Sequence, residues 1–175
     1  LEAAANRLVA GDWTTDRHPL LAVGVTERQE SLALFDAMAV TTEPAHISEY
    51  SVTANGEQVA QFRADGLVVA TPAGTSGYAR AAGAPVISPG AGVLALVPIA
   101  PFATTLDHWV VPDDEVTITV KRDDATVDVL ADDRTIGVAA VDEPVRISTD
   151  GVIETIRVPE GNSVFEAPGA ELEKL

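Results

Sequence analysis

The sequence predicts an all-β fold: a sandwich of two sheets, built from about eleven short strands, with a short helix after a glycine-rich loop. Three observations lead to this prediction. Apolar residues recur with a period of two along most of the chain, turn residues separate the short apolar runs, and helical spacing is confined to the start. The core must come from small aliphatic side chains, because 46% of the 175 residues are hydrophobic and only 5% are aromatic.

The first element expected is a helix over residues 2–10, where Ala and Leu recur at helical spacing before Gly11, a typical C-terminal cap. The strands expected after it are short and rich in β-branched residues. They cover residues 20–25, 32–41, 47–54, 59–62, 67–71, 93–99, 116–120, 127–130, 135–139, 145–148 and 152–158. Turn residues connect them, as in Asn55-Gly56, Asp132-Asp133 and Asp150-Gly151.

Two segments interrupt the strand pattern. Residues 71–85 are rich in glycine and hydroxyl groups and predict a loop that leads into a short helix. Residues 98–112 contain three prolines and are expected to be irregular. We expect a single domain over residues 1–162, followed by a tail over residues 163–175 that is mobile or docks a partner.

Composition excludes several classes of protein. The chain has no cysteine, so disulfides, thiolate metal sites and cysteine nucleophiles are ruled out. No apolar run approaches the roughly 18 residues needed to span a bilayer, and the N-terminal stretch lacks the pattern of a secretory signal. We therefore expect no membrane partner and a cytoplasmic location. A nucleic-acid partner is also not expected, because 27 Asp and Glu against 11 Lys and Arg give a net charge of −16.

This charge balance, with Lys121 and Lys174 as the only lysines, is typical of proteins that work in molar salt, although an acidic mesophilic protein is the alternative. If the protein is halophilic, its melting temperature should rise by several degrees between 0.2 and 3 M KCl, because 1 M salt screens charges beyond about 3 Å. An unchanged melting temperature would rule out the halophilic interpretation.

The segment Thr71-Pro72-Ala73-Gly74-Thr75-Ser76-Gly77-Tyr78 is the best candidate for a binding site. Its glycines allow close backbone approach, its hydroxyl groups can bind a ligand, and a following helix would offer free N–H groups to a phosphate or ribose. An ordinary strand-to-helix turn is the alternative, since loops of this composition are common. The segment is neither a G-x-S-x-G nucleophile elbow nor a Walker A loop.

Other polar residues carry less information. His18, His46 and His108 are scattered without paired spacing, which argues against a histidine metal site. The acidic pairs, Asp132-Asp133 among them, fall at expected strand turns without the EF-hand spacing, so we interpret them as solvated turns rather than calcium ligands.

The order of residues around the glycine-rich loop is more specific than the loop alone. Residues 65–78 read DGLVVATPAGTSGY and residues 81–86 read AAGAPV, which resembles the NAD kinase stretch DGLIVSTPTGSTAY followed by SAGGPI. ALFD at residues 33–36 is similar to the family's ALND or ALNE, and VPIAP at residues 97–101 to its VPICPH. From about residue 5 to residue 160, the chain resembles the C-terminal β-sandwich domain of the ATP-NAD kinases.

This resemblance implies phosphorylation of the adenosine-ribose 2′-hydroxyl of NAD, with ATP or polyphosphate as donor and magnesium as cofactor. It implies that Asp36 contacts a ribose and that Asp65 holds the nicotinamide end. The remaining residues that it implies for the NAD pocket are Thr71, Gly74, Ser76, Gly77 and Tyr78. It also implies homo-oligomers that share residues across the interface, as dimers or tetramers. The small loop residues would let the adenine and ribose lie against the backbone.

The chain departs from the family pattern in ways that bear on function. Phe35 stands where asparagine is expected, so an amide is replaced by a ring that can stack on a base but cannot hydrogen-bond a ribose in the same way. Ala73 replaces a hydroxyl residue. The GGDG motif, which in this family binds the phosphoryl donor and supplies the catalytic aspartate, does not occur in the chain. We therefore expect the chain to be part of a longer enzyme and to be inactive alone.

Two alternatives to an NAD kinase remain open at the level of sequence. A nucleotide-binding or regulatory module could have kept the sandwich and lost kinase activity, and Phe35 is the main argument for it. A kinase of the wider superfamily that acts on a lipid or sphingoid base is less favoured, because the run from Asp65 to Tyr78 points to NAD.

Overall fold

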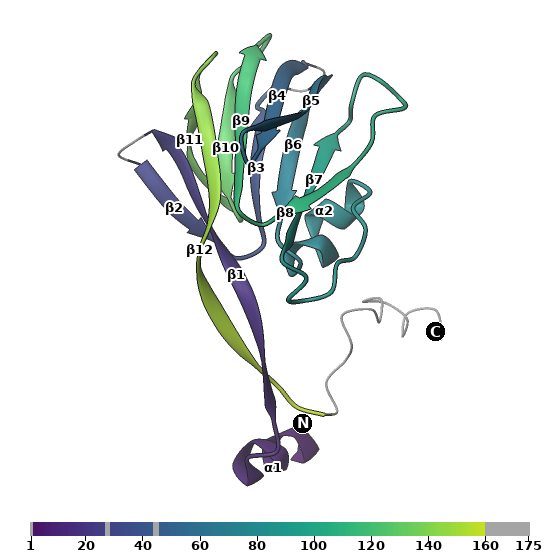
Figure 1. Cartoon of the computed structure of the whole chain (residues 1–175), viewed down its shortest axis with the longest axis vertical. Coiled ribbons are helices and arrows are strands. Elements are labelled where there is room, and N and C mark those ends of the chain that lie inside the picture. The colour runs from purple at the N-terminus through teal and green to yellow at the C-terminus, as the bar shows by residue number, and fades with distance from the viewer. Residues whose placement is uncertain (1, 27–28, 44–45, 160–175) are drawn as a thin grey trace.

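The computed structural model describes residues 2–26, 29–43 and 46–159. In this part of the chain, twelve strands form two antiparallel six-stranded sheets that pack face to face (Figure 1). The first sheet has the order β2-β1-β12-β9-β4-β5, and the second has the order β11-β10-β3-β6-β7-β8. The all-β sandwich expected from the sequence is confirmed. The tail expected over residues 163–175 lies outside the described residues.

The strands of the first sheet are β1 (Thr14–Thr26), β2 (Gln29–Ala33), β4 (Ser48–Ala54), β5 (Glu57–Ala64), β9 (Glu115–Arg122) and β12 (Pro144–Arg157). Those of the second sheet are β3 (Asp36–Thr41), β6 (Gly66–Ala70), β7 (Val93–Ile99), β8 (Trp109–Pro112), β10 (Val127–Ala131) and β11 (Arg134–Ala139). The helical elements are α1 (Glu2–Ala10), the 3₁₀ turn η1 (Gly74–Ser76) and α2 (Tyr78–Ala81).

The core lies between the sheets and is mostly aliphatic, as the composition predicts. Along β4, buried and half-buried side chains alternate, so that one face of the strand points into the sandwich. Tyr50 is fully buried there, and its ring lies 5.9 Å from the ring of Phe62, which in turn stacks on Trp109 at 6.0 Å. These aromatic contacts hold the edge strands of the two sheets together, since Phe62 belongs to β5 and Trp109 to β8.

A two-stranded ribbon extends from the sandwich and ends at α1 (Figure 1). It consists of the first half of β1 paired with the second half of β12, from Thr14 opposite Arg157 to Pro19 opposite Val152. The helix predicted over residues 2–10 is confirmed, and Gly11 closes it with a φ of 73°. No residue of α1 is buried. None of the helices in the described part of the chain is long and apolar enough to cross a membrane.

Three details of the strand prediction were wrong. The strand expected over residues 32–41 is two strands in different sheets, because the chain changes sheet at Leu34 and Phe35. The turn expected at Asp150-Gly151 is instead a bulge within the continuous strand β12, where the register with β1 shifts and Gly151 has a φ of 87°. Strand β8 was missed, because Pro112 ends it at the sheet edge, where a missing N–H is tolerated.

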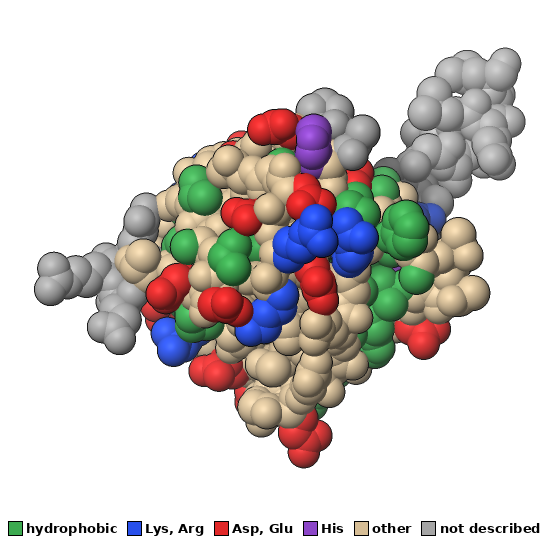
Figure 2. Space-filling view, turned by 90° about the horizontal axis from the view of Figure 1, so that it is seen from above, with side chains coloured by type: hydrophobic (Ala, Val, Ile, Leu, Met, Phe, Trp, Pro, Cys, Tyr) green, Lys and Arg blue, Asp and Glu red, His purple; other side chains and the backbone are tan. Residues whose placement is uncertain are grey.

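Figure 2 shows one end of the molecule, with acidic side chains spread over the face among Lys, Arg and apolar side chains. The acidic residues on this face therefore do not gather into one patch.

Candidate functional site

The glycine-rich segment leaves the sheet at the end of β6 and turns at once into η1 and α2. Its hydroxyl groups are largely used to hold its own shape. The Thr75 hydroxyl donates to the carbonyl oxygen of Pro72 at 2.7 Å and accepts from the N–H of Ile87 at 3.0 Å, and Ser76 donates to the carbonyl of Ala73 at 3.0 Å. Buried apolar side chains, among them Ala79 and Ala84, pack the segment against the outer face of the second sheet. It is therefore anchored to the sheet rather than free to adapt.

The corner Leu34–Phe35–Asp36, where the chain passes from β2 to β3, lies directly beside this segment. Thr71 is fully buried, and its hydroxyl lies 2.8 Å from the carbonyl oxygen of Leu34 and 3.1 Å from that of Phe35. The backbone also contributes, since the N–H of Thr71 donates to the Phe35 carbonyl at 2.9 Å. A Cβ atom on Gly74 would lie 2.6 Å from the carbonyl carbon of Phe35, which explains the glycine at this position. The two segments form one rigid unit.

A cavity of about 630 Å³ opens between the glycine-rich segment, the corner and the β10–β11 turn. Its volume falls in the range of small-molecule sites. Four of its lining residues were predicted from the sequence: Asp36, Ser76, Gly77 and Tyr78. The others are Phe35, Met38, Ala73, Asp132 and Asp133. The rings of Phe35 and Tyr78 are each about half exposed, so the cavity offers aromatic and aliphatic surface together with carboxylates.

The carboxylates give the cavity a negative potential. Asp36 is only 6% exposed, and burial, followed by the negative charge of Asp132, raises its pKa to about 6. None of the described residues that line the cavity is Lys or Arg. The cavity therefore suits a ligand group that donates hydrogen bonds, such as a sugar hydroxyl or an exocyclic amine, and it disfavours a phosphate.

The structure places the predicted site residues in three groups. Asp36, Ser76, Gly77 and Tyr78 line the cavity together. Thr71 and Gly74 are buried and do not line the cavity. Thr71 is hydrogen-bonded to the corner and Gly74 packs against it, so both residues support the cavity wall.

Asp65 forms the third group, because it precedes β6 while the glycine-rich segment follows that strand. Pairing of Val40 with Gly66 and of Asp36 with Ala70 puts Asp65 near the opposite end of β3, about 17 Å along the strand from Asp36. The structure therefore does not bring Asp36 and Asp65 to one cavity within the chain.

Two further sequence interpretations change. Asp132 and Asp133, interpreted as a solvated turn, line the cavity, and their local sequence pattern did not indicate this. The helix after the loop was expected to present free N–H groups to a phosphate. It is a single turn, too short to build the macrodipole that attracts an anion.

The residues at the cavity do not form a metal site. Within residues 2–26, 29–43 and 46–159, no three histidine or acidic side chains are grouped so that they could hold a metal ion. At the cavity, both carboxylate oxygens of Asp132 already accept backbone N–H groups. The described residues at the cavity therefore do not offer the three protein ligands of a dedicated metal site.

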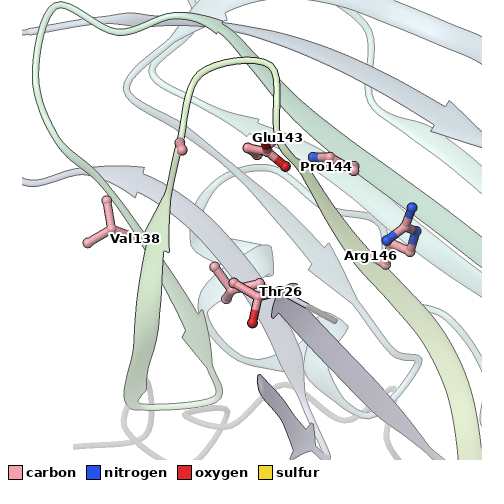
Figure 3. A pocket seen from close by; sticks show the side chains of 7 residues that line it. Thr26, Val138, Glu143, Pro144 and Arg146 are labelled. Carbon is pink, nitrogen blue, oxygen red and sulfur yellow. The ribbon is translucent and has the colours of Figure 1, made fainter. Parts of the chain in front are cut away.

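A second cavity, of about 560 Å³, lies where β1 and β11 meet the start of β12. Glu143 and Arg146 contribute its charged groups, and Val138 contributes apolar surface from β11 (Figure 3). It contains none of the predicted site residues and no aromatic ring, so it offers less to a nucleotide than the first cavity does.

Comparison with known proteins gives consistent results. The family model described as ATP-NAD kinase C-terminal domain matches residues 35–165. The chain is 36% identical over 110 residues to an NAD kinase of Thermococcus sibiricus, covering 63% of this chain and 40% of the relative. It is also 36% identical over 120 residues to an NAD kinase of Nitrosomonas europaea, covering 66% and 40%. The chain thus spans about two fifths of the length of these relatives.

Solved structures share the fold. An NAD kinase from Archaeoglobus fulgidus in complex with ATP superposes with a TM-score of 0.78 at 23% identity, over 99% of this chain and 66% of that one. Yeast NADH kinase complexed with NADH gives a TM-score of 0.78 at 15% identity, over 98% and 54%.

Proposed function

The chain belongs to the ATP-NAD kinase family, and from this premise we propose that it is the NAD-binding part of a cytoplasmic enzyme that phosphorylates NAD. In the proposed reaction, a phosphoryl group passes from ATP to the 2′-hydroxyl of the adenosine ribose. The NAD kinases of Thermococcus sibiricus and Nitrosomonas europaea support this proposal by their similarity.

The observation that carries the proposal is the pairing of a buried carboxylate with half-exposed rings in one cavity. Asp36 can accept a hydrogen bond from a ribose hydroxyl, and near neutral pH the group, with its pKa of about 6, is largely ionised. Phe35 and Tyr78 offer faces on which a base can lie. These are the contacts that a nucleoside needs, so we assign the cavity to the nucleoside part of NAD.

The cavity does not supply what the phosphates need. Its carboxylates would repel the pyrophosphate and the triphosphate of ATP. We propose that a segment outside this chain, carrying the GGDG motif that the resemblance implies, holds the phosphoryl donor and provides the catalytic aspartate. Magnesium would neutralise phosphate charge in that complex, and we assign no residue of this chain to it.

The position of Asp65 supports the homo-oligomer that the resemblance implies. Asp65 lies near the other end of β3 from Asp36, so it does not line the cavity of its own chain. We propose that a second copy contributes its Asp65 to the nicotinamide end of the ligand, whereas Asp36, Ser76, Gly77 and Tyr78 come from the first copy. Thr71 and Gly74 would then support the site from beneath.

The direct test is conversion of NAD to NADP. We expect the full-length protein to form NADP from NAD, ATP and magnesium in molar KCl, and this chain alone to form none. Replacing Asp36 with Asn should lower kcat/KM for NAD by about 10- to 100-fold, because the charged partner of a ribose hydroxyl is lost. Full-length protein without turnover at any salt concentration would contradict the proposal.

A second candidate function rests on Phe35. Its ring takes the place of the amide that the resemblance implies at a ribose, and it is half exposed at the cavity, ready to stack on a base. A regulatory module that binds a nucleotide without phosphorylating it would fit this observation. Calorimetry with NAD, NADP and ATP distinguishes the two functions. If the protein is a regulatory module, this chain alone should bind one of these nucleotides, while the full-length protein should show no kinase activity.

A further inference from the structure

Both oxygens of the Asp132 carboxylate accept hydrogen bonds from the backbone of the corner between β2 and β3. Its Oδ1 accepts the N–H groups of Phe35 at 2.7 Å and Asp36 at 3.2 Å, and its Oδ2 accepts the N–H of Leu34 at 2.9 Å. The backbone N–H of Asp132 in turn donates to the carbonyl oxygen of Asp36 at 2.8 Å. Asp132 thus makes four hydrogen bonds to three consecutive residues that lie almost a hundred positions earlier in the chain.

The conformation of Asp132 makes this contact possible. Its φ of 53° lies in the left-handed region, which Asp tolerates better than most residues, and it turns the carboxylate back over the corner. Hydrogen bonds from N–H groups to an ionised carboxylate are roughly twice as strong as those between neutral groups. The arrangement therefore serves to hold the corner and is not a free turn.

The corner is held from its other side as well. The hydroxyl of Thr71 reaches the carbonyl oxygens of Leu34 and Phe35 at 2.8 and 3.1 Å. Asp132 thus holds the N–H groups of Phe35 and Asp36 and the carbonyl group of Asp36, and Thr71 holds the carbonyl group of Phe35. Both residues therefore have little backbone freedom. Their side chains are then presented to the cavity in a fixed position.

We infer that Asp132 is a positioning residue of the nucleoside cavity, which acts on the ligand through Phe35 and Asp36. The inference rests on the proposed function and adds a residue to its binding site. The corner uses three of the roughly four acceptor positions of the Asp132 carboxylate, which leaves at most one for the ligand. Its neighbour Asp133 lines the same cavity, and no hydrogen bond joins its carboxylate to the corner within the described residues.

Asparagine is the conservative replacement for this role. Its side-chain oxygen could keep the bonds from Phe35 and Asp36, but its amide group would face the N–H of Leu34, donor against donor. Alanine would leave all three N–H groups without a partner. The role as a positioning residue therefore predicts that Asp132→Ala disturbs the corner and weakens NAD binding most, and that Asp132→Asn does so less.

The test compares Asp132→Ala, Asp132→Asn and Asp133→Asn in the full-length protein. For Asp132→Ala we expect the KM for NAD to rise about 10- to 100-fold with kcat changed by less than about 3-fold, because a misplaced corner weakens binding of the substrate and transition state alike. Asp132→Asn should lie between Asp132→Ala and the unchanged protein. Asp133→Asn removes a charge from the same cavity and should raise KM clearly less than Asp132→Ala does.

Amide hydrogen exchange in this chain is the second readout, and it does not depend on kinase activity. The N–H groups of Leu34, Phe35 and Asp36 should exchange at least about 10-fold faster in Asp132→Ala, and in Asp132→Asn this increase should be confined to the N–H of Leu34. The N–H groups of the β4–β9 pair should keep their rates in both variants. Unchanged exchange at the corner would overturn the inference even if the protein proves not to be an NAD kinase. A KM that is unchanged in Asp132→Ala, or raised equally in Asp133→Asn, would overturn it as well.

Discussion

Replacing Asp36 with Asn should stabilise the folded chain at pH 8 by about 3 kcal/mol and leave its stability nearly unchanged at pH 4. Burial, and to a lesser extent the charge of Asp132, raises the pKa of Asp36 from 3.8 to about 6, so ionising this group costs free energy in the folded state. That difference corresponds to about 3 kcal/mol. The folded state binds the proton more tightly, so the neutral carboxyl contributes stability below pH 3.8 that is lost as the pH rises through about 6.

Urea unfolding at constant KCl concentration, followed from pH 4 to pH 8, measures this effect. Asp123→Asn is the matched control, because it removes the same charge from an exposed position. Its free energy of unfolding should stay within about 0.5 kcal/mol of the unchanged protein at both pH values. Equal stability of Asp36→Asn and the unchanged protein at pH 8 would show that Asp36 ionises without cost. The stability lost at neutral pH is the physical cost of keeping a carboxylate inside the proposed ribose site.

The fold followed from the sequence where local pattern decides structure. The two-residue period of β4 and β9 marks their buried faces, and β7 is a continuous apolar run; all three strands were predicted to within two residues. The split between β2 and β3 could not be predicted in this way. It depends on Asp132, whose carboxylate holds the corner from a turn that is distant in sequence. A period-two pattern continues through Phe35 whether or not the chain changes sheet there.

The site was predictable in its residues more than in its arrangement. The loop sequence identified Ser76, Gly77 and Tyr78, and the structure brings them to Asp36. Gly74 was attributed to close approach of a ligand, but the group that approaches it is the chain's own Phe35 carbonyl. Such a contact joins segments far apart in sequence, so no local signal indicates it. For Asp65 the resemblance supplied a role without stating which copy of the chain it would serve.

Replacing Gly74 with Ala should lower the free energy of unfolding by about 3 kcal/mol, because the added methyl group would overlap the Phe35 carbonyl. Neither the corner nor the glycine-rich segment can move easily to relieve this overlap. The corner is bonded to Asp132 on its N–H side and to Thr71 on its carbonyl side, and the N–H of Gly74 itself donates to the Thr71 hydroxyl at 3.2 Å. Relief of the overlap must therefore break hydrogen bonds of a buried group.

Gly77→Ala is the matched control in the same segment. A Cβ atom there meets only the carbonyl oxygen of Gly74, at 3.4 Å, so the added methyl group has no overlap to relieve. Gly77 has a φ of −99° and a ψ of −128°, outside the main regions of residues with a side chain, so we expect its free energy of unfolding in urea to fall by about 1 kcal/mol. If Gly74→Ala is as stable as Gly77→Ala, the corner yields readily and cannot be the rigid support of the cavity. If Gly74→Ala is clearly the more destabilised of the two, the glycine at position 74 is required first by the fold, because its packing against the corner shapes the surface of the proposed binding site.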